Sequence, residues 1–423
     1  MKLAPSVFAL ILVACGGSVA GSGADSGTTS PDSGTTMPVD AGGPPDASTP
    51  EDSGTDSGVA IPAWHPPAPQ VISYGGGVLQ APTIIPVFYA SDPLQSKVEQ
   101  MLQGLPQSTY WTAISKEYGV GAISIASSIV LNDTPPSKID DSEIATWLGT
   151  NVDGTHAPWP KADGSQIYAI FYPQSTVITL QGSQSCYGFG AYHEESITKI
   201  GLNFPYAVMP RCGGGMAIDS LTVAVSHEII EAATDPFVQS TPAYQAVDFD
   251  HYTWAFFPGG EVGDMCAFER QAEQKLVGNF MVQRSWSNVS AKASHDPCVP
   301  ALAQPYFNSA PDFKDKIKLN FGGGGVTTKG MKIPIGQSGT VDVYLFADAP
   351  TGPWNVEAVD AASFQGQNPE LSFEWDKTTG QNGDVLHLKV TALQASNYGV
   401  SLFVIRSDQN GIEHLWYGAV VNN

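Results

Sequence analysis

Residues 226–236 read SHEIIEAATDP and place one imidazole and two carboxylates on a segment that the sequence predicts to be helical. At 100° per residue, His227 and Glu231 are four positions apart and share one face of that helix, with Glu228 at its edge. The remaining faces are apolar, so we expect the helix to be buried nearly all round. A buried imidazole and two buried carboxylates are costly without partners, and a bound cation would satisfy them.

The spacing is close to HExxH, the motif in which two histidines of one helix bind zinc in the zincin peptidases. Here Glu231 stands where the second histidine would be, and a carboxylate is an acceptable zinc ligand. We therefore predict one Zn²⁺ ion bound by His227 and Glu231, with Glu228 as the general base. A site with one imidazole fewer is less selective for zinc. The alternative is a buried helix with an internal His–Glu hydrogen bond and no metal.

A third protein ligand has to come from another segment. The spacing of Glu261 and Asp264 in EVGDMC resembles the downstream segment of zincins that use a glutamate. We assign Glu261 as the third ligand and Asp264 as the carboxylate that orients His227. The reverse assignment fits nearly as well, so the choice between the two stays open.

Several other polar residues are weaker candidates. Asp250, His251 and His295 could replace a ligand, and His251 or Tyr252 could act as an oxyanion donor. Residues 193–195, His-Glu-Glu, follow a Gly- and Tyr-rich stretch, and we predict a surface turn there. No G-x-S-x-G elbow is present, so the sequence gives no support for a Ser-His-Asp triad.

The segment that contains these residues, 62–300, alternates predicted strands and helices. Apolar runs of strand length and helix start signals follow one another, which is typical of an α/β or α+β domain. Together with the motif at residues 227–231, they predict a zincin-like domain. The predicted strands cover residues 83–89, 122–131 and 166–172, and the predicted helices cover 92–105, 108–118 and 142–148.

Residues 301–423 differ, because short strands recur there and turn residues separate them. About seven strands in about 120 residues fit an all-β sandwich of the immunoglobulin-like kind. The predicted strands cover residues 316–321, 340–347, 354–359, 371–375, 385–391, 400–407 and 414–421.

The N-terminus predicts export. Lys2 and a short apolar stretch precede Cys15 in a pattern that resembles a bacterial lipoprotein signal, so residues 1–15 would be the signal and Cys15 would carry lipid. An ordinary secretory signal is the alternative. Residues 16–61 are rich in Gly, Ser, Thr, Pro and Asp and predict a disordered tether. Gly16 favours the outer membrane, so we expect a lipid-anchored protein facing the periplasm or the cell surface.

The four remaining cysteines predict two disulfides, because an even number in an exported chain is typical of a disulfide framework. Three pairings are possible. We choose Cys186 with Cys212 and Cys266 with Cys298, since each closes a local loop. A zinc–thiolate site is the rival interpretation, but no CxxC spacing supports it.

Composition excludes one class of partner. The 423 residues carry 19 basic and 41 acidic side chains, a net charge of −22, so a nucleic-acid partner is not expected. No internal stretch approaches 18 apolar residues, so we expect contact with the membrane through lipid only.

Scattered short motifs lie within residues 68–298, at residues 74–76, 86–89, 108–111, 167–173, 186–193, 205–208, 226–236, 261–266 and 286–288. These motifs resemble the EXORDIUM (phosphate-induced protein 1) family. Bacterial relatives bear SHExxEAxTDP and look like zinc-dependent metallopeptidases, whereas many plant members lack it and are extracellular proteins without a clear activity. The resemblance implies a peptide or protein substrate. The alternative is a non-catalytic surface lipoprotein that binds envelope or extracellular matrix material.

Overall fold

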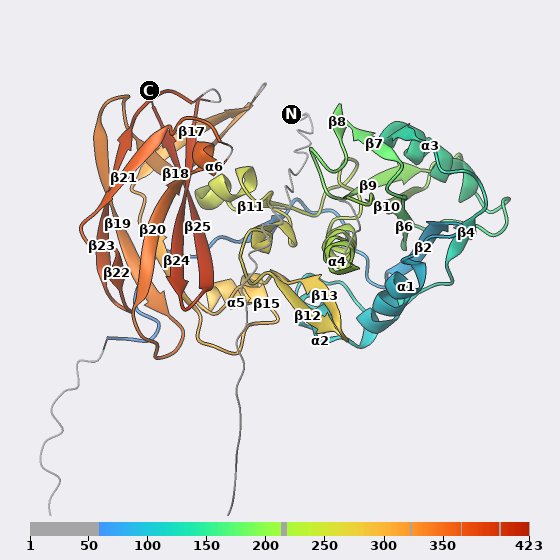
Figure 1. Cartoon of the computed structure of the whole chain (residues 1–423), viewed down its shortest axis with the longest axis horizontal. Helices are drawn as coiled ribbons and strands as arrows, with labels where there is room; N and C mark the ends of the chain where they lie inside the picture. The colour runs from blue at the N-terminus through green and yellow to red at the C-terminus, as the bar shows by residue number, and fades with distance from the viewer. Residues whose placement is uncertain (1–58, 213–217, 322–323, 365, 397–398, 423) are drawn as a thin grey trace, which may run out of the picture. The chain divides into compact units, whose positions relative to one another are not determined.

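A computed structural model of the chain describes residues 59–212, 218–321, 324–364, 366–396 and 399–422. Over these residues the protein is rich in β-sheet and has few helices (Figure 1). Cys15 and residues 16–58 of the predicted tether lie outside them. Residues 60–423 belong to one compact unit. No helix among the described residues is long and apolar enough to cross a membrane.

A six-stranded sheet forms the centre of residues 62–300. Its three middle strands are parallel, and β9 closes one edge in the antiparallel direction. The middle strands are almost continuously apolar and buried, as expected of parallel strands covered on both faces. The strands are β2 (Thr83–Tyr89), β3 (Ser124–Ile125), β4 (Ile129–Leu131), β6 (Gln166–Phe171), β9 (Tyr192–Ile197) and β10 (Asn203–Met209).

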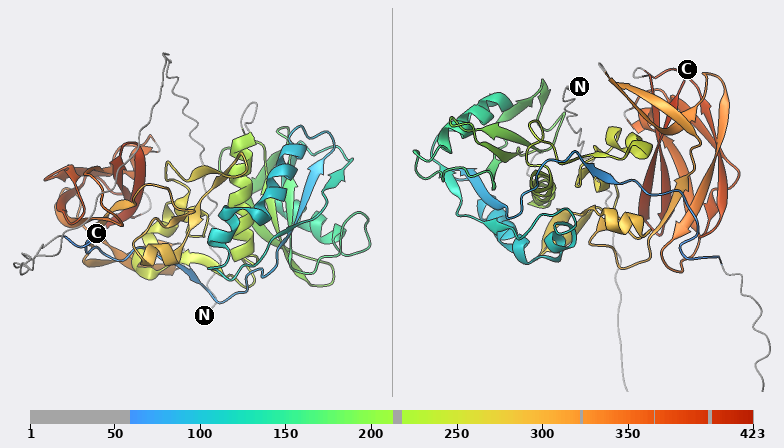
Figure 2. Two further views of the ribbon diagram at one scale, coloured as in Figure 1. Left: turned by 90° about the horizontal axis from the view of Figure 1, so that it is seen from below. Right: turned by 180° about the vertical axis from the view of Figure 1, so that it is seen from behind.

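Helices cover the two faces of this sheet, as Figures 1 and 2 show. Alternate residues of each strand point to opposite faces. Ile84 and Phe88 therefore join the core beneath α4 (Ile218–Thr234) and α1 (Gln95–Gly104). Ile85 and Val87 join a second core beneath α3 (Asp141–Asn151).

The predicted strands and helices of this region are present, but several begin or end at residues other than the predicted ones. The first predicted helix divides into α1 and a short η1 (Leu105–Gln107), and α2 (Thr109–Ile114) ends four residues earlier than expected. The Ser108 hydroxyl caps α2 by accepting a hydrogen bond from the Trp111 amide. The predicted strand at 122–131 consists of two short strands, β3 and β4.

Small sheets and short helices surround the main sheet. The hairpin of β12 (Glu273–Val277) and β13 (Phe280–Gln283) packs against α4. The short helix η3 (Asp264–Cys266) donates a backbone hydrogen bond to Glu231 of α4. The other elements are β1 (Val71–Ser73), β5 (Lys138–Asp140), β7 (Val177–Leu180), β8 (Ser183–Gln184), β11 (Tyr244–Val247), η2 (Phe249–Phe256), β14 (Ser285–Trp286), α5 (Asn288–Lys292) and β15 (Cys298–Val299).

Residues 301–423 form two facing sheets, drawn in orange and red in Figure 1. One has the order β16-β19-β23-β21 and the other β17-β18-β25-β24-β20-β22. All seven predicted strands are present, and β16, β18 and β22 are additional. The elements are β16 (Phe307–Pro311), β17 (Asp315–Phe321), β18 (Gly324–Lys332), β19 (Ser338–Ala347), β20 (Trp354–Asp360), α6 (Ala361–Phe364), β21 (Leu371–Trp375), β22 (Thr379–Gly380), β23 (Val385–Ala392), β24 (Ser401–Gln409) and β25 (Ile412–Val421).

Both predicted disulfides are confirmed. Cys186 pairs with Cys212 at a Cα–Cα distance of 5.0 Å, and Cys266 pairs with Cys298 at 5.8 Å. Structural disulfides form in oxidising compartments, so they indicate an extracellular or periplasmic protein.

Removing the Cys266–Cys298 bridge is expected to lower the free energy of unfolding by about 2–5 kcal/mol, because the unfolded chain loses a constraint. The variant for comparison lacks the Cys186–Cys212 bridge instead. The two bridges close loops of similar length, because Cys266 and Cys298 are 32 residues apart and Cys186 and Cys212 are 26 apart. Equilibrium unfolding in urea measures both double Cys→Ser variants. An unchanged midpoint for the Cys266→Ser/Cys298→Ser variant would contradict the expectation.

Candidate metal centre

Helix α4 carries the three predicted residues into the interior. Its apolar stripe joins the main core. The helix also contacts β9 and β13, and the Asp264 amide of η3 donates a hydrogen bond to Glu231. The exposed fractions of His227, Glu228 and Glu231 are 2%, 3% and 2%. The helix is therefore buried nearly all round, as predicted. Its polar residues depend on each other and on neighbouring segments for compensation. The stripe comprises Leu221, Val225, Ile229 and Ala232.

The two ring nitrogens of His227 have different partners. Nε2 lies 3.1 Å from Glu231 Oε2 and 3.5 Å from Asp264 Oδ1. Nδ1 lies 3.1 Å from Oε1 of Gln283, and the amide nitrogen of Gln283 donates to the Gly263 carbonyl at 2.7 Å. The second bond fixes the amide orientation, so Oε1 accepts a hydrogen bond from Nδ1–H. In the neutral ring, Nε2 then presents its lone pair to the carboxylates.

Gln283 is therefore a supporting residue that the sequence analysis missed. It lies at the end of β13, and its side chain is buried. Its own backbone amide donates to the Ser226 hydroxyl at 3.0 Å, which ties the strand to the start of the motif. A glutamine in a short strand carries no local signal of such a role.

The segment 261–264 approaches α4 closely. The Asp264 amide donates to Glu231 Oε1 at 3.0 Å, and Asp264 Oδ2 accepts from the Glu261 amide at 3.2 Å. A Cβ added to Gly263 would lie 2.8 Å from Glu231 Oε1 and 2.9 Å from His227 Nδ1. Only a glycine leaves room for both side chains at that point.

Gly263→Ala is accordingly expected to weaken zinc binding about 10–100-fold, the range typical of disturbed supporting residues. Gly77→Ala is a matched control, since a Cβ there would meet nothing within 4 Å. Competition with a chromogenic zinc chelator measures both affinities. Equal affinities for the two variants would contradict the expectation.

Glu261 and Asp264 occupy different places. Asp264 faces His227, and Glu261 does not. Glu261 Oε1 instead lies 3.8 Å from Nε2 of His193, and neither atom has a hydrogen-bond partner among the described residues. The arrangement thus favours the reverse of the primary assignment, with Asp264 on the ligand side of His227.

The expectation of a surface turn at residues 193–195 is wrong. His193 lies on the edge strand β9, with only 4% of its side chain exposed. Its Nδ1 is 3.4 Å from Glu228 Oε2 and 3.6 Å from Glu231 Oε2. Pairing of β9 with β10 directs this side chain toward α4, which sequence spacing alone does not show.

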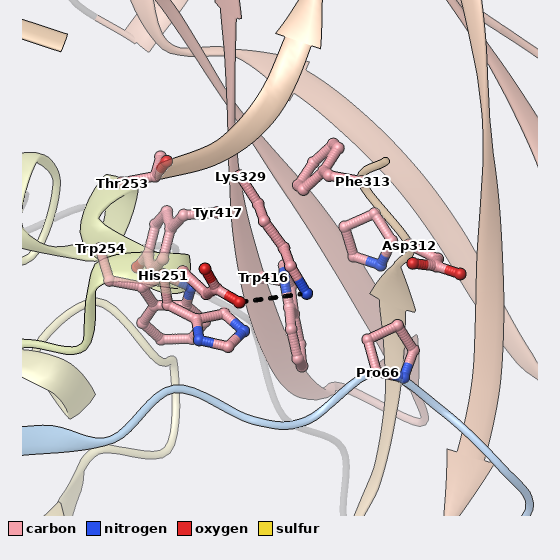
Figure 3. Close-up of a pocket in the computed structure, with 11 residues that line it drawn as sticks. Pro66, His251, Thr253, Trp254, Asp312, Phe313, Lys329, Trp416 and Tyr417 are labelled. Atoms are coloured by element: carbon pink, nitrogen blue, oxygen red, sulfur yellow. Dashed lines mark ion pairs between the residues drawn. The ribbon is translucent and has the colours of Figure 1, made fainter. Parts of the chain in front are cut away.

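The weaker candidates have other partners. His251 Nδ1 lies 2.9 Å from Asp248, and His295 Nδ1 lies 3.1 Å from Asp348. Asp250 forms ion pairs with lysines of β17 and β18. Asp250 and His251 line the cavity of Figure 3, whose volume of about 20 Å³ has room for a single water molecule.

Protonation in the cluster reflects an excess of negative charge. Burial alone would lower the pKa of His227, but Glu231 and other carboxylates raise it well above its ordinary value. The same balance raises the pKa of His193 to about 9. Burial and neighbouring carboxylates raise the pKa values of Glu261 and Asp264 well above their usual range. Burial would also raise the pKa of Glu231, but His227 lowers it. A bound cation would replace the protons held in this way.

A separate cluster of two acidic residues and a histidine already contains a positively charged arginine. Glu269, Asp296 and His414 converge, but the fully buried guanidinium of Arg284 lies 2.6 Å from Asp296 and 3.7 Å from Glu269. Its positive charge offsets one of the two negative charges, and His414 Nδ1 lies 3.4 Å from Glu269, so this group differs from a site with no cation of its own.

Comparisons with known proteins add little. No family model matches the chain, and no curated protein matches it. Among solved structures, titin domain M4 is 11% identical, with 22% of this chain and 86% of that chain covered and a TM-score of 0.16. A FixG-related protein from Vibrio parahaemolyticus is 10% identical, with 29% and 99% covered and a TM-score of 0.19. These scores are too low to support an argument about fold or function.

Proposed function

We propose that the protein is an exported, zinc-dependent hydrolase of peptide bonds. The observation that carries the proposal is the convergence of His227 Nε2, Glu231 Oε2 and Asp264 Oδ1 within one buried cluster. Tetrahedral zinc ligands at about 2.1 Å lie about 3.4 Å from one another. The separations of 3.1 and 3.5 Å around His227 Nε2 are close to that value.

Each residue has a defined part in this proposal. His227, Glu231 and Asp264 would hold the zinc ion, and Gln283 keeps His227 in the required tautomer. Zinc would supply a Lewis acid that lowers the pKa of a bound water and polarises the scissile carbonyl. Glu228, next to His227 on α4, would accept the proton of that water.

The proposal includes export and a lipid anchor at Cys15 on the outer membrane. The two disulfides support export. Membership of the EXORDIUM-like family stays a prediction, as does the zincin-like character of residues 62–300.

A second candidate is a structural metal site without turnover in a non-catalytic surface lipoprotein. Burial of the cluster favours this structural site. A catalytic ion needs a coordination position open to substrate, and Asp264 is only 4% exposed. Glu261, with 18% of its side chain exposed, is where the cluster approaches solvent.

Metal content and activity together test the proposal. We expect at least one zinc ion in each purified molecule, peptidase activity on a mixed peptide library, and loss of activity on chelation that zinc restores. Bound zinc without cleavage would favour the structural site. Absence of zinc at stoichiometric supply would favour the metal-free surface protein.

A further inference from the structure

His193 is the one histidine of the cluster that the proposed zinc ion does not use. Its Nδ1 is 3.4 Å from Glu228 and 3.6 Å from Glu231, and its Nε2 is 3.8 Å from Glu261. Most of these separations are too long for hydrogen bonds, and Nε2 has no hydrogen-bond partner among the described residues. The side chain is nevertheless 96% buried, since 4% of it is exposed. A buried imidazole whose Nε2 has no partner and faces a carboxylate needs a physical explanation.

The donor atoms fall into two sets with one shared member. His227, Glu231 and Asp264 form one set, and His193, Glu228 and Glu231 form the other. Within each set, all donor atoms lie within 4.8 Å of one another. The two histidines are in different sets, which is the arrangement expected of two neighbouring ions with Glu231 between them.

We infer that His193, Glu228 and Glu231 form a second divalent-cation site and that Glu231 bridges it to the ion at His227. The inference rests on the proposed function only through the first ion, with which it shares Glu231. Pairs of catalytic ions about 3.5–4 Å apart are known in aminopeptidases and phosphatases, so such a centre suits hydrolysis.

Charge supports two ions. Five buried or mostly buried carboxylates belong to the cluster, and with neutral histidines they carry five negative charges. One divalent ion would leave three of those charges uncompensated in the interior, whereas two ions leave one. The five carboxylates are those of Glu228, Glu231, Asp235, Glu261 and Asp264.

The chemistry of the ligands limits which divalent ion would bind at the second site. One imidazole with two carboxylates suits Zn²⁺ or Mn²⁺ better than Ca²⁺ or Mg²⁺, which prefer oxygen alone.

Glu261 faces the free nitrogen of His193 and is partly exposed, so it lies between the second site and solvent. Glu228 would bind through Oε2, which faces His193, and would accept the proton on Oε1.

Metal stoichiometry tests the inference. The purified protein, stripped with a chelator and dialysed against Zn²⁺, is expected to bind two ions by elemental mass spectrometry. His193→Ala is expected to bind one. The matched control is His156→Ala, because His156 is exposed and pairs with Asp153 away from the cluster, and it should keep two.

A spectroscopic measurement covers the case in which His193→Ala fails to fold. Two Mn²⁺ ions bridged by Glu231 should give an exchange-coupled electron paramagnetic resonance spectrum in the wild-type protein. Isolated Mn²⁺ spectra at every loading would overturn the inference without any variant.

The outcomes separate this inference from the proposed function. One ion in the wild type that His193→Ala retains would overturn the second site and leave the first. One ion that both His193→Ala and His227→Ala lose would show a single shared site, which also overturns the second. No bound ion in the wild type would overturn both proposals.

Discussion

Glu228→Gln is expected to lower peptidase activity about a hundredfold or more, while at least one zinc ion per molecule stays bound. General-base catalysis typically contributes 10²- to 10⁴-fold, and the substitution removes the base with little change of shape. The ion proposed at His227, Glu231 and Asp264 would not use Glu228, so its site would stay intact. Initial rates and zinc content, measured on the same preparation, check both parts.

Glu194→Gln is the matched control for this loss. Glu194 is also a buried carboxylate, 5% exposed, but it accepts a hydrogen bond from Gln239 instead of facing the cluster. It should keep activity within about twofold, as expected of a residue that touches neither substrate nor metal. Equal losses in the two variants, or full activity of Glu228→Gln, would contradict the assignment of the base.

His227→Ala is expected to lower zinc content by at least one ion per molecule and to reduce the stabilisation that zinc provides. A ligand that binds only the folded state at 100 times its Kd stabilises it by about 2.7 kcal/mol. The variant loses the one imidazole of the set formed by His227, Glu231 and Asp264. Thermal unfolding with and without zinc measures the change.

His387→Ala serves as the control for this variant. His387 lies on the sandwich strand β23, is 54% exposed and pairs with Asp342. It should show the same zinc-dependent increase in Tm as the wild type. If His227→Ala also showed that full increase and unchanged zinc content, His227 would not be a ligand.

The sequence was informative where one local pattern determined the structure. Strands β2 and β6 are continuous apolar runs, and α4 combines an apolar stripe with a proline after its end, so their positions could be predicted. Strand β9 reads YHEESI, a mixture of polar residues, and its pattern gave no such signal. Only its register against β10 reveals which residues face α4.

The site residues also divide into those that a local sequence pattern predicts and those that only tertiary packing brings together. The pair His227 and Glu231 follows from helical spacing alone. The roles of Glu261 and Asp264 depend on a short helical turn, and spacing fits both assignments. Gln283 and His193 come from strands whose distance from α4 is set by tertiary packing. No local pattern could have selected them.

The Cys266–Cys298 bridge has a consequence for the order in which the protein matures. Cys266 lies two residues after Asp264 in the same short helix, η3. Before oxidation, this helix lacks its covalent tie to β15, and Asp264 is less firmly placed beside α4. If zinc binds as proposed, a complete set of its ligands therefore depends on a step that belongs to an oxidising compartment. The newly made chain would compete poorly for cytoplasmic zinc and would be loaded with metal after export.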